Sequence, residues 1–158
     1  MSKITPCLWF ATQAEEAARF YVSLLPDSRV THVQKSPTDY PGGKAGAVLV
    51  VEFTLAGQTY KALNGGMTMP FSNAISFSIS CDDQAEVDRL WDALLVGGTA
   101  QQCGWVTDRY GLPWQIVPTA LPRLLADPDP VRAKRAMQAM MTMVKLDIAE
   151  LEKAAAGD

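Results

Sequence analysis

The chain has 158 residues, of which 48% are hydrophobic and 20% are charged, so it can bury an ordinary core and wholesale disorder is not expected. Its formal charge of −3 and its pI near 5.1 argue against a nucleic-acid partner, which would need a basic face on the protein. No apolar run is long enough to cross a bilayer, and a strand pattern rather than a signal peptide follows Met1. We therefore expect a soluble, cytoplasmic protein with no membrane partner.

The cysteines and the histidine restrict the catalytic chemistry. Cys7, Cys81 and Cys103 are odd in number and form no C-x-x-C pair, so reduced structural thiols are expected. A nucleophilic role for Cys103 is the less favoured alternative. His32 is the only histidine, which leaves little for a Ser-His-Asp relay within one chain.

The first half of the chain has a strand, a helix and then three strands. Thr12 and Glu15 have the spacing of a capping box and predict the start of a helix that Pro26 ends. Residues 35–46 are rich in Pro, Gly and Ser and indicate an exposed loop, and the turn Ala56-Gly57 predicts a hairpin. From alternating apolar residues, the expected strands are 4–10, 28–34, 47–55 and 58–63.

The second half repeats this order without obvious sequence identity. Asp83 and Glu86 predict the start of a helix with an apolar stripe, and Gly97-Gly98 ends it. The turn at 108–111, Asp-Arg-Tyr-Gly, precedes the last strand. The expected strands are 74–80, 99–102, 104–107 and 113–117.

These patterns predict an α+β fold with two tandem βαβββ modules that form a curled mixed sheet. The modules are residues 1–64 and 74–118, the linker is 65–73, and a helical tail occupies 119–158 of what we expect to be one structural domain. Modules of this kind pair most simply edge to edge, so that their concave faces line one cleft. Four methionines in the tail, Met137, Met140, Met141 and Met143, are more consistent with core or dimer contacts than with an adaptable ligand surface.

Several segments resemble a known family. The segments A-x-x-F-Y at 17–21, AISFSISCDD, CGWVTDRYG and WQIVP are similar to the PhnB-like branch of the vicinal-oxygen-chelate superfamily, which includes glyoxalases, bleomycin-resistance proteins and extradiol dioxygenases. The resemblance covers about residues 3–118 and extends to DPDP and KLDIAELEKA in the tail. It implies the glyoxalase-like fold of paired βαβββ modules. Such proteins often carry the label 3-demethylubiquinone-9 3-methyltransferase domain.

In metal-using members of this superfamily, four side chains bind a divalent ion. The resemblance places those positions on Thr5, Asn64, Ala74 and Gln115. Ala74 has no ligand atom, and the other three offer only weak neutral oxygens, which compete poorly with water for Fe, Mn, Ni or Zn. We therefore expect a metal-independent protein, and we predict no cofactor.

The methyltransferase label has little support from the residues. A nucleotide-type fold for S-adenosylmethionine needs a glycine-rich turn after its first strand, whereas ATQAEEAARF follows the first strand here and contains no glycine. Whether the protein is an enzyme stays open at this point, because fold analogy does not establish activity.

We expect the cleft between the modules to bind a small, partly apolar molecule through aromatic walls and a few hydroxyl and amide groups. Its candidate lining residues are Thr5, Cys7, Trp9, Tyr60, Asn64, Ala74, Ser76, Ser78, Trp105, Arg109 and Gln115, with Ala62 also on the same side of its strand. Core packing is the plainer interpretation for each tryptophan alone, and Trp114 is expected in the core. Glu52 and Lys61 are expected to form a cross-strand or exposed pair.

Three classes of function remain open from the sequence. The favoured one is a metal-independent small-molecule-binding protein, and the alternatives are an enzyme that uses the same cleft, including a methyltransferase, and an assembly protein. Saturable binding without turnover, product formation, or a cleft occluded in a dimer would distinguish them. We also expect a homodimer whose modules could be exchanged between partners through the linker.

Overall fold

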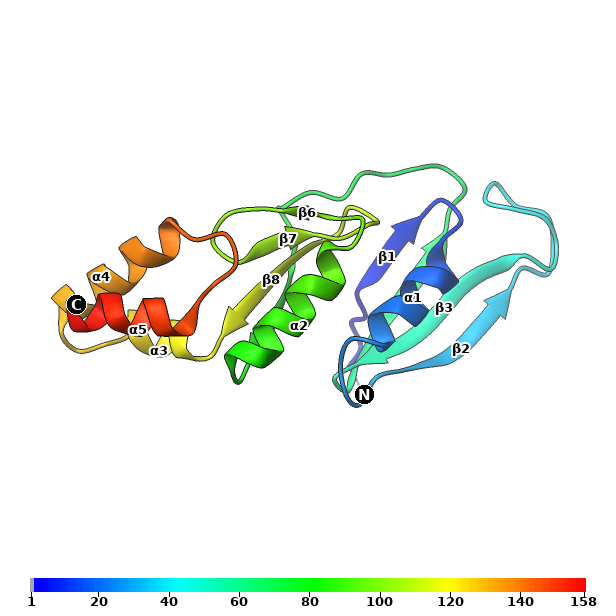
Figure 1. Cartoon of the computed structure of the whole chain (residues 1–158). Coiled ribbons are helices and arrows are strands. Elements are labelled where there is room, and N and C mark those ends of the chain that lie inside the picture. The colour runs from blue at the N-terminus through cyan, green and yellow to red at the C-terminus, as the bar shows by residue number, and fades with distance from the viewer. Residues whose placement is uncertain (1) are drawn as a thin grey trace. The chain divides into compact units, whose positions relative to one another are not determined.

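The computed structural model describes residues 2–158 and divides the chain into two compact units (Figure 1). Unit 1 ends at Pro70 and unit 2 is Phe71–Asp158, so the boundary falls within the predicted linker. Each unit contains one mixed four-stranded sheet.

Unit 1 has the order strand, helix, strand, strand, strand. Its elements are β1 (Cys7–Phe10), α1 (Ala14–Val22), β2 (Arg29–Lys35), β3 (Val48–Leu55) and β4 (Gln58–Asn64). The strands lie in the order β1-β4-β3-β2, with β1 parallel to β4 and the other neighbours antiparallel. The predicted Ala56-Gly57 turn joins β3 to β4, and both of its residues have positive φ, as a tight hairpin turn requires.

The core of unit 1 lies between α1 and one face of the sheet. Val51, Phe53 and Leu55 alternate along β3 and are buried, and Ala17 and Tyr21 of α1 are fully buried against that side. Phe53 lies 6.4 Å from Tyr21, measured between ring centroids. The strand alternation read from the sequence is therefore confirmed for β3.

The predicted cap of α1 is wrong. The helix begins at Ala14, and neither Thr12 nor Gln13 caps it through a side chain. The amide of Ala14 instead donates to Oδ1 of Asn64, 2.9 Å away and 50 residues later in the chain. Asn64, at the end of β4, thus provides the hydrogen-bond acceptor that a local capping residue would otherwise provide.

Two strands begin later than predicted. β1 starts at Cys7 rather than residue 4, and β5 (Phe77–Cys81) starts at 77 rather than 74. Ile4 and Ile75 lie in the predicted strands but outside the observed ones, and they are 82% and 74% exposed. The apolar periodicity extends beyond the residues that pair with a neighbouring strand, so it overestimates the length of both strands.

Unit 2 repeats the arrangement. After β5 come α2 (Gln84–Leu95), β6 (Thr99–Ala100), β7 (Trp105–Thr107) and β8 (Pro113–Pro118). The strand order is β5-β8-β7-β6, with β5 parallel to β8 and the other neighbours antiparallel. Val87, Leu90, Trp91 and Leu94 form the buried stripe of α2, as predicted.

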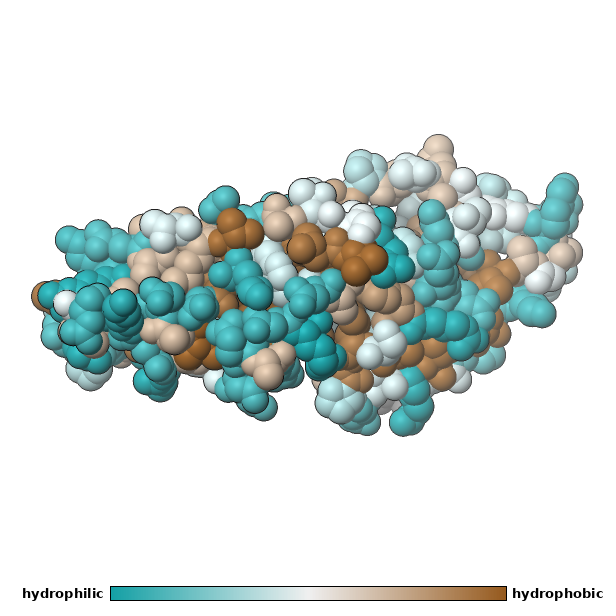
Figure 2. Space-filling model, in the orientation of Figure 1, coloured by the Kyte–Doolittle hydropathy of each residue, from teal (hydrophilic) through white to brown (hydrophobic). Residues whose placement is uncertain are grey.

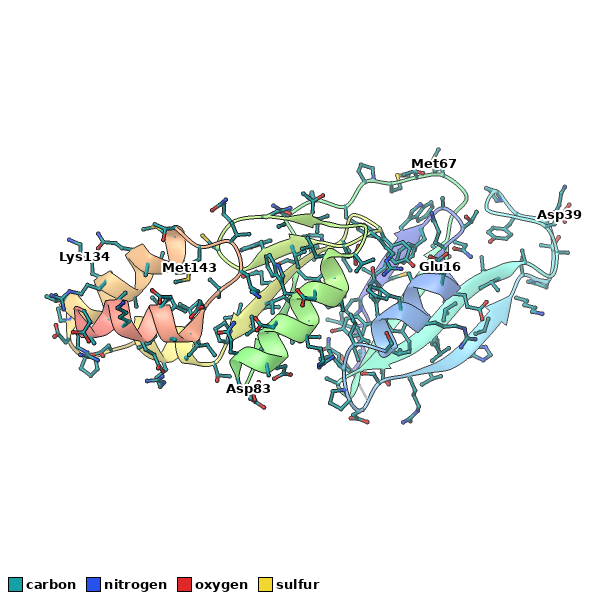
Figure 3. The ribbon with its side chains drawn as sticks, in the orientation of Figure 1. Glu16, Asp39, Met67, Asp83, Lys134 and Met143 are labelled. Carbon is teal, nitrogen blue, oxygen red and sulfur yellow. The ribbon has the colours of Figure 1, made fainter. Side chains whose placement is uncertain are left out.

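Side-chain carboxylates fix the turns of unit 2. Asp83, labelled in Figure 3, caps α2 by accepting the amide of Glu86 at 2.8 Å, which confirms the predicted cap. Glu86 in turn accepts the amide of Asp82, one residue before the cap. Asp108 is buried and accepts hydrogen bonds from the amides of Tyr110 and Leu112 and from Nε1 of Trp114.

The tail of unit 2 has three helices with a core of their own: α3 (Ala120–Leu125), α4 (Pro130–Met141) and α5 (Ile148–Ala156). Asp129 and Asp147 cap α4 and α5 through their carboxylates, and α4 ends at Met141. The outward side of α4 and α5 seen in Figure 2 is largely hydrophilic. The buried cluster of the tail comprises Leu121, Leu124, Ala136, Leu146, Leu151 and Ala155, with Met140 and Met143 packed on it.

Gln84 joins α5 to α2. Its Oε1 accepts the amide of Ile148 at 2.8 Å, and its Nε2 donates to the carbonyl of Leu146 at 3.0 Å. Within residues 2–158, none of the helices combines the length and the apolar character that crossing a bilayer demands. The observed architecture confirms the expected α+β fold of two βαβββ modules followed by helices.

Candidate functional site

Each sheet has one face packed on the helix of its own βαβββ module and one face that this helix does not cover. We call the uncovered sides open face 1, on unit 1, and open face 2, on unit 2. Side chains of laterally paired residues point to the same side of a sheet, so the strand register determines which residues share each open face. Each open face is a candidate site in its own right.

Open face 1 carries a row of ionisable side chains that crosses all four strands. His32 pairs with Glu52, Glu52 with Lys61, and Lys61 with Cys7. Glu52 and Lys61 form the expected cross-strand pair, with 3.8 Å between Oε1 and Nζ. We call these four residues the charged row.

A row of apolar side chains lies next to the charged row on the same face, two residues away along each strand. Val50 pairs with Leu63, and Leu63 pairs with Trp9. All three are half-buried, so they expose apolar surface beside the charged groups. We call these three residues the apolar row.

Trp9 is fixed by its surroundings. Its Nε1 donates to the carbonyl of Met67, labelled in Figure 3, at 2.7 Å. Its ring lies over Gly65, where an added Cβ would come within 1.9 Å of Cζ2. Trp9 therefore cannot rotate freely, and it presents a preorganised aromatic surface.

Open face 2 is neutral. Ser78, Gln115 and Trp105 lie side by side across β5, β8 and β7. Nε2 of Gln115 donates to Oγ of Ser76 at 2.9 Å, which orients the amide. At the other end of β8, Val117 packs against the tail cluster, so the tail covers that end of the face.

Two predicted cleft residues lie on the wrong side of their sheet. Tyr60 stacks on Phe53, with 5.6 Å between ring centroids, and Asn64 is 6% exposed under α1. Ala62, on the same side of β4, is fully buried. Oδ1 of Asn64 accepts the amide of Ala14, and Nδ2 donates to the carbonyl of Val48. The side chain therefore supports the fold and does not line an open face.

The remaining predicted residues are dispersed. Thr5 is half-buried and precedes β1, and Ala74 lies in an exposed turn before β5. Cys7 is exposed as a residue, but partial desolvation of its thiol raises the pKa of that group, and the ammonium of Lys61 opposes the change. Arg109 is exposed in the 108–111 turn, and Trp114 is 1% exposed in the core, as expected.

The four superfamily metal positions do not fit a divalent ion. Asn64 faces the helix side of its sheet, Ala74 has no donor atom, and the amide of Gln115 bonds to Ser76. Among residues 2–158 no three His, Cys, Asp or Glu side chains gather in a way that could hold a metal.

A hollow of about 620 Å³ adjoins the charged row. Glu52 and Lys61 line it together with Thr5, Thr59 and the exposed Ile4. Glu52 and Lys61 are not among the predicted site residues, because an exposed ion pair is usually only a surface feature. The place of Glu52 on an uncovered face follows from the alternation along β3, which was available from the sequence, and the pairing of Glu52 with Lys61 places Lys61 on the same face.

One family model matches most of the chain. Residues 2–117 match the family model described as 3-demethylubiquinone-9 3-methyltransferase. A comparison with curated proteins finds no match. The tail beyond residue 117 lies outside the family match.

Several solved structures also match the chain. A PhnB protein of Bacillus cereus, which carries a 3-demethylubiquinone-9 3-methyltransferase name, is 30% identical over 75% of this chain and 100% of its own, with a TM-score of 0.68. A Pseudomonas aeruginosa protein is 22% identical over 75% and 98%, with a TM-score of 0.62. A glyoxylase/bleomycin resistance protein/dioxygenase domain of Frankia sp. also matches, at 14% identity over 75% and 92%, with a TM-score of 0.48. The predicted PhnB-like resemblance is confirmed, and the chain belongs to the 3-demethylubiquinone-9 3-methyltransferase family.

Proposed function

We propose that this protein binds a small, partly apolar organic molecule on its open faces without a bound metal. One observation carries the proposal: both sheets leave a face uncovered by their own module's helix, and each such face combines aromatic surface with oriented polar groups. Buried sites for small molecules have this composition, with apolar walls and a few fixed polar atoms.

The polar atoms of open face 2 suit a neutral ligand group. Since Nε2 of Gln115 is used by Ser76, its Oε1 is left to accept a hydrogen bond from a ligand, and it makes none to another described residue. The exposed Ser78 hydroxyl lies beside it and can donate or accept. Trp105 on the next strand supplies an aromatic surface for an apolar part of the ligand.

Native mass spectrometry tests the proposal. Protein purified without added metal should carry an extra organic mass, or take up such a ligand saturably, and Trp105→Ala should weaken this retention. Lys134→Ala changes an exposed residue of α4 (Figure 3) and should leave retention unchanged. A stoichiometric transition metal, or retention that is insensitive to Trp105, would contradict the proposal.

The same samples address the enzyme alternative. Conversion of the retained molecule into a product of different mass would show turnover and move the enzyme hypothesis to first place. Methyl transfer would appear as a gain of one methyl group that depends on added S-adenosylmethionine. The residues of the β1–α1 connection, Ala11-Thr12-Gln13, supply no glycine turn for that cofactor.

We also propose a homodimer in the cytoplasm. β1 and β5 each have one unpaired edge within their own sheets, and such edges readily accept another strand. The three cysteines are unpaired, which suits a reducing compartment. Light scattering that gives a monomer mass at micromolar concentration would contradict the dimer.

A further inference from the structure

The ion pair in the charged row of open face 1 is incompletely satisfied. The side chains of Glu52 and Lys61 are 41% and 44% exposed, and their closest charged atoms are 3.8 Å apart. This separation exceeds a hydrogen bond, and neither side chain hydrogen bonds to another residue of the described chain. Both groups therefore keep their hydrogen-bonding capacity for a ligand.

Such a pair can be engaged at low cost. Half-exposed ion pairs contribute little to stability. A ligand that separates this pair therefore removes little of the folding stability of the protein. An ammonium beside a carboxylate matches a ligand that carries both opposite charges. A ligand with one charge would satisfy one side chain and be repelled by the other.

The surroundings of the pair define the rest of the ligand. On one side lie Thr5 and Thr59, which also line the hollow. On the other side lies the apolar row, roughly 7 Å away because side chains on one face repeat every two residues. An aromatic amino acid spans a comparable distance between its head group and its ring.

We propose that open face 1 binds a zwitterion with an apolar body, of which an aromatic α-amino acid is the simplest example. The ligand carboxylate is bound by Lys61 and its ammonium by Glu52, while the apolar body lies on Val50, Leu63 and Trp9. The proposal rests on the proposed function and names the ligand class for this face.

Titration calorimetry with four probes tests each part of this ligand. The probes are L-phenylalanine, phenethylamine without the carboxylate, 3-phenylpropionate without the ammonium, and glycine without the ring. Hydrogen bonds to charged groups and burial of a ring each favour the complete probe, so L-phenylalanine should bind at least about tenfold more tightly than any of the others.

Single substitutions connect each ligand group to its residue, in the manner of a double-mutant cycle. Lys61→Met should make L-phenylalanine and phenethylamine bind alike, and Glu52→Gln should make L-phenylalanine and 3-phenylpropionate bind alike. Lys153→Met is a matched control, because Lys153 is exposed on α5 in unit 2, and it should preserve the order of the four probes. Circular dichroism establishes that each variant is folded.

The outcomes separate this inference from the function on which it rests. If 3-phenylpropionate or phenethylamine binds the native protein as tightly as L-phenylalanine, the zwitterion inference is overturned. If none of the probes binds while the purified protein retains an organic mass that depends on Trp105, the proposed function holds and the inference fails. Absence of both retention and probe binding overturns both.

Discussion

Replacement of Asn64 by alanine should destabilise unit 1 without acting on ligand binding directly. The side chain is 6% exposed and joins three parts of the unit: Oδ1 accepts the Ala14 amide at 2.9 Å, and Nδ2 donates to the Val48 carbonyl at 3.0 Å. The loss of a helix cap costs about 1 kcal/mol, and a buried amide left without an acceptor costs about 1–3 kcal/mol. Because the Tyr40 hydroxyl also donates to the Val48 carbonyl, that carbonyl keeps one donor.

The expected loss in the free energy of unfolding is therefore about 2–3 kcal/mol. For a unit of this size, that loss corresponds to a fall in the unfolding temperature of roughly 10–20 °C. Asn64→Asp is the informative partner variant, because it keeps the acceptor for Ala14 and places a negative charge at the α1 N-terminus, where it is favourable. It should lose less than half of what the alanine variant loses.

Urea unfolding followed by circular dichroism, with scanning calorimetry to separate the two units, measures both variants. A loss below about 0.5 kcal/mol for Asn64→Ala, or equal losses for alanine and aspartate, would refute the cap assignment. Weaker ligand binding with unchanged stability would instead restore Asn64 to the site in which the sequence analysis placed it.

Three further predictions follow from individual contacts. Gly65→Ala should cost about 1–3 kcal/mol by driving the new Cβ into the Trp9 ring, and in a Trp9→Ala background the same substitution should cost almost nothing; urea unfolding of the four proteins decides this. Gln84→Ala should release α5 from α2, so amide hydrogen exchange in α5 should accelerate while exchange in α1 is unchanged, and equal protection in both proteins would contradict the link. Cys81 is fully buried, and burial, reinforced by the Glu86 carboxylate, raises the pKa of its thiol to about 12. In the folded protein iodoacetamide should therefore modify exposed Cys7 and spare Cys81 at every pH below that value, which peptide mass spectrometry can follow; early modification of Cys81 would show that the thiol is accessible.

Local patterns predicted the features that local residues determine. The caps Asp83, Asp129 and Asp147 each accept an amide two or three residues ahead, so sequence spacing is sufficient to find them. The Ala56-Gly57 hairpin is likewise set by two residues with positive φ.

The predictions that failed concern features that depend on contacts between residues distant in the sequence. The α1 cap comes from Asn64, and no pattern around Thr12 could reveal it. The sidedness of β4 depends on its pairing with β3: the register Phe53 to Tyr60 places Tyr60 toward the helix, whereas an isolated strand pattern of Tyr60, Ala62 and Asn64 is equally consistent with either side. Once the helix side of β3 was known from Phe53, the side occupied by Glu52 followed.

The tail is continuous with the structure of the family-matched region. The amides of Cys103 and Gly104 donate to the carbonyls of Met143 and Val144, at 2.8 and 2.7 Å, and Val117 contributes to the packing of the tail cluster. Met143, labelled in Figure 3, lies in the segment between α4 and α5. A shortened protein that ends at residue 117 would lack the acceptors of these two amides and would expose Val117. The smallest form of unit 2 that folds on its own should therefore extend through α5.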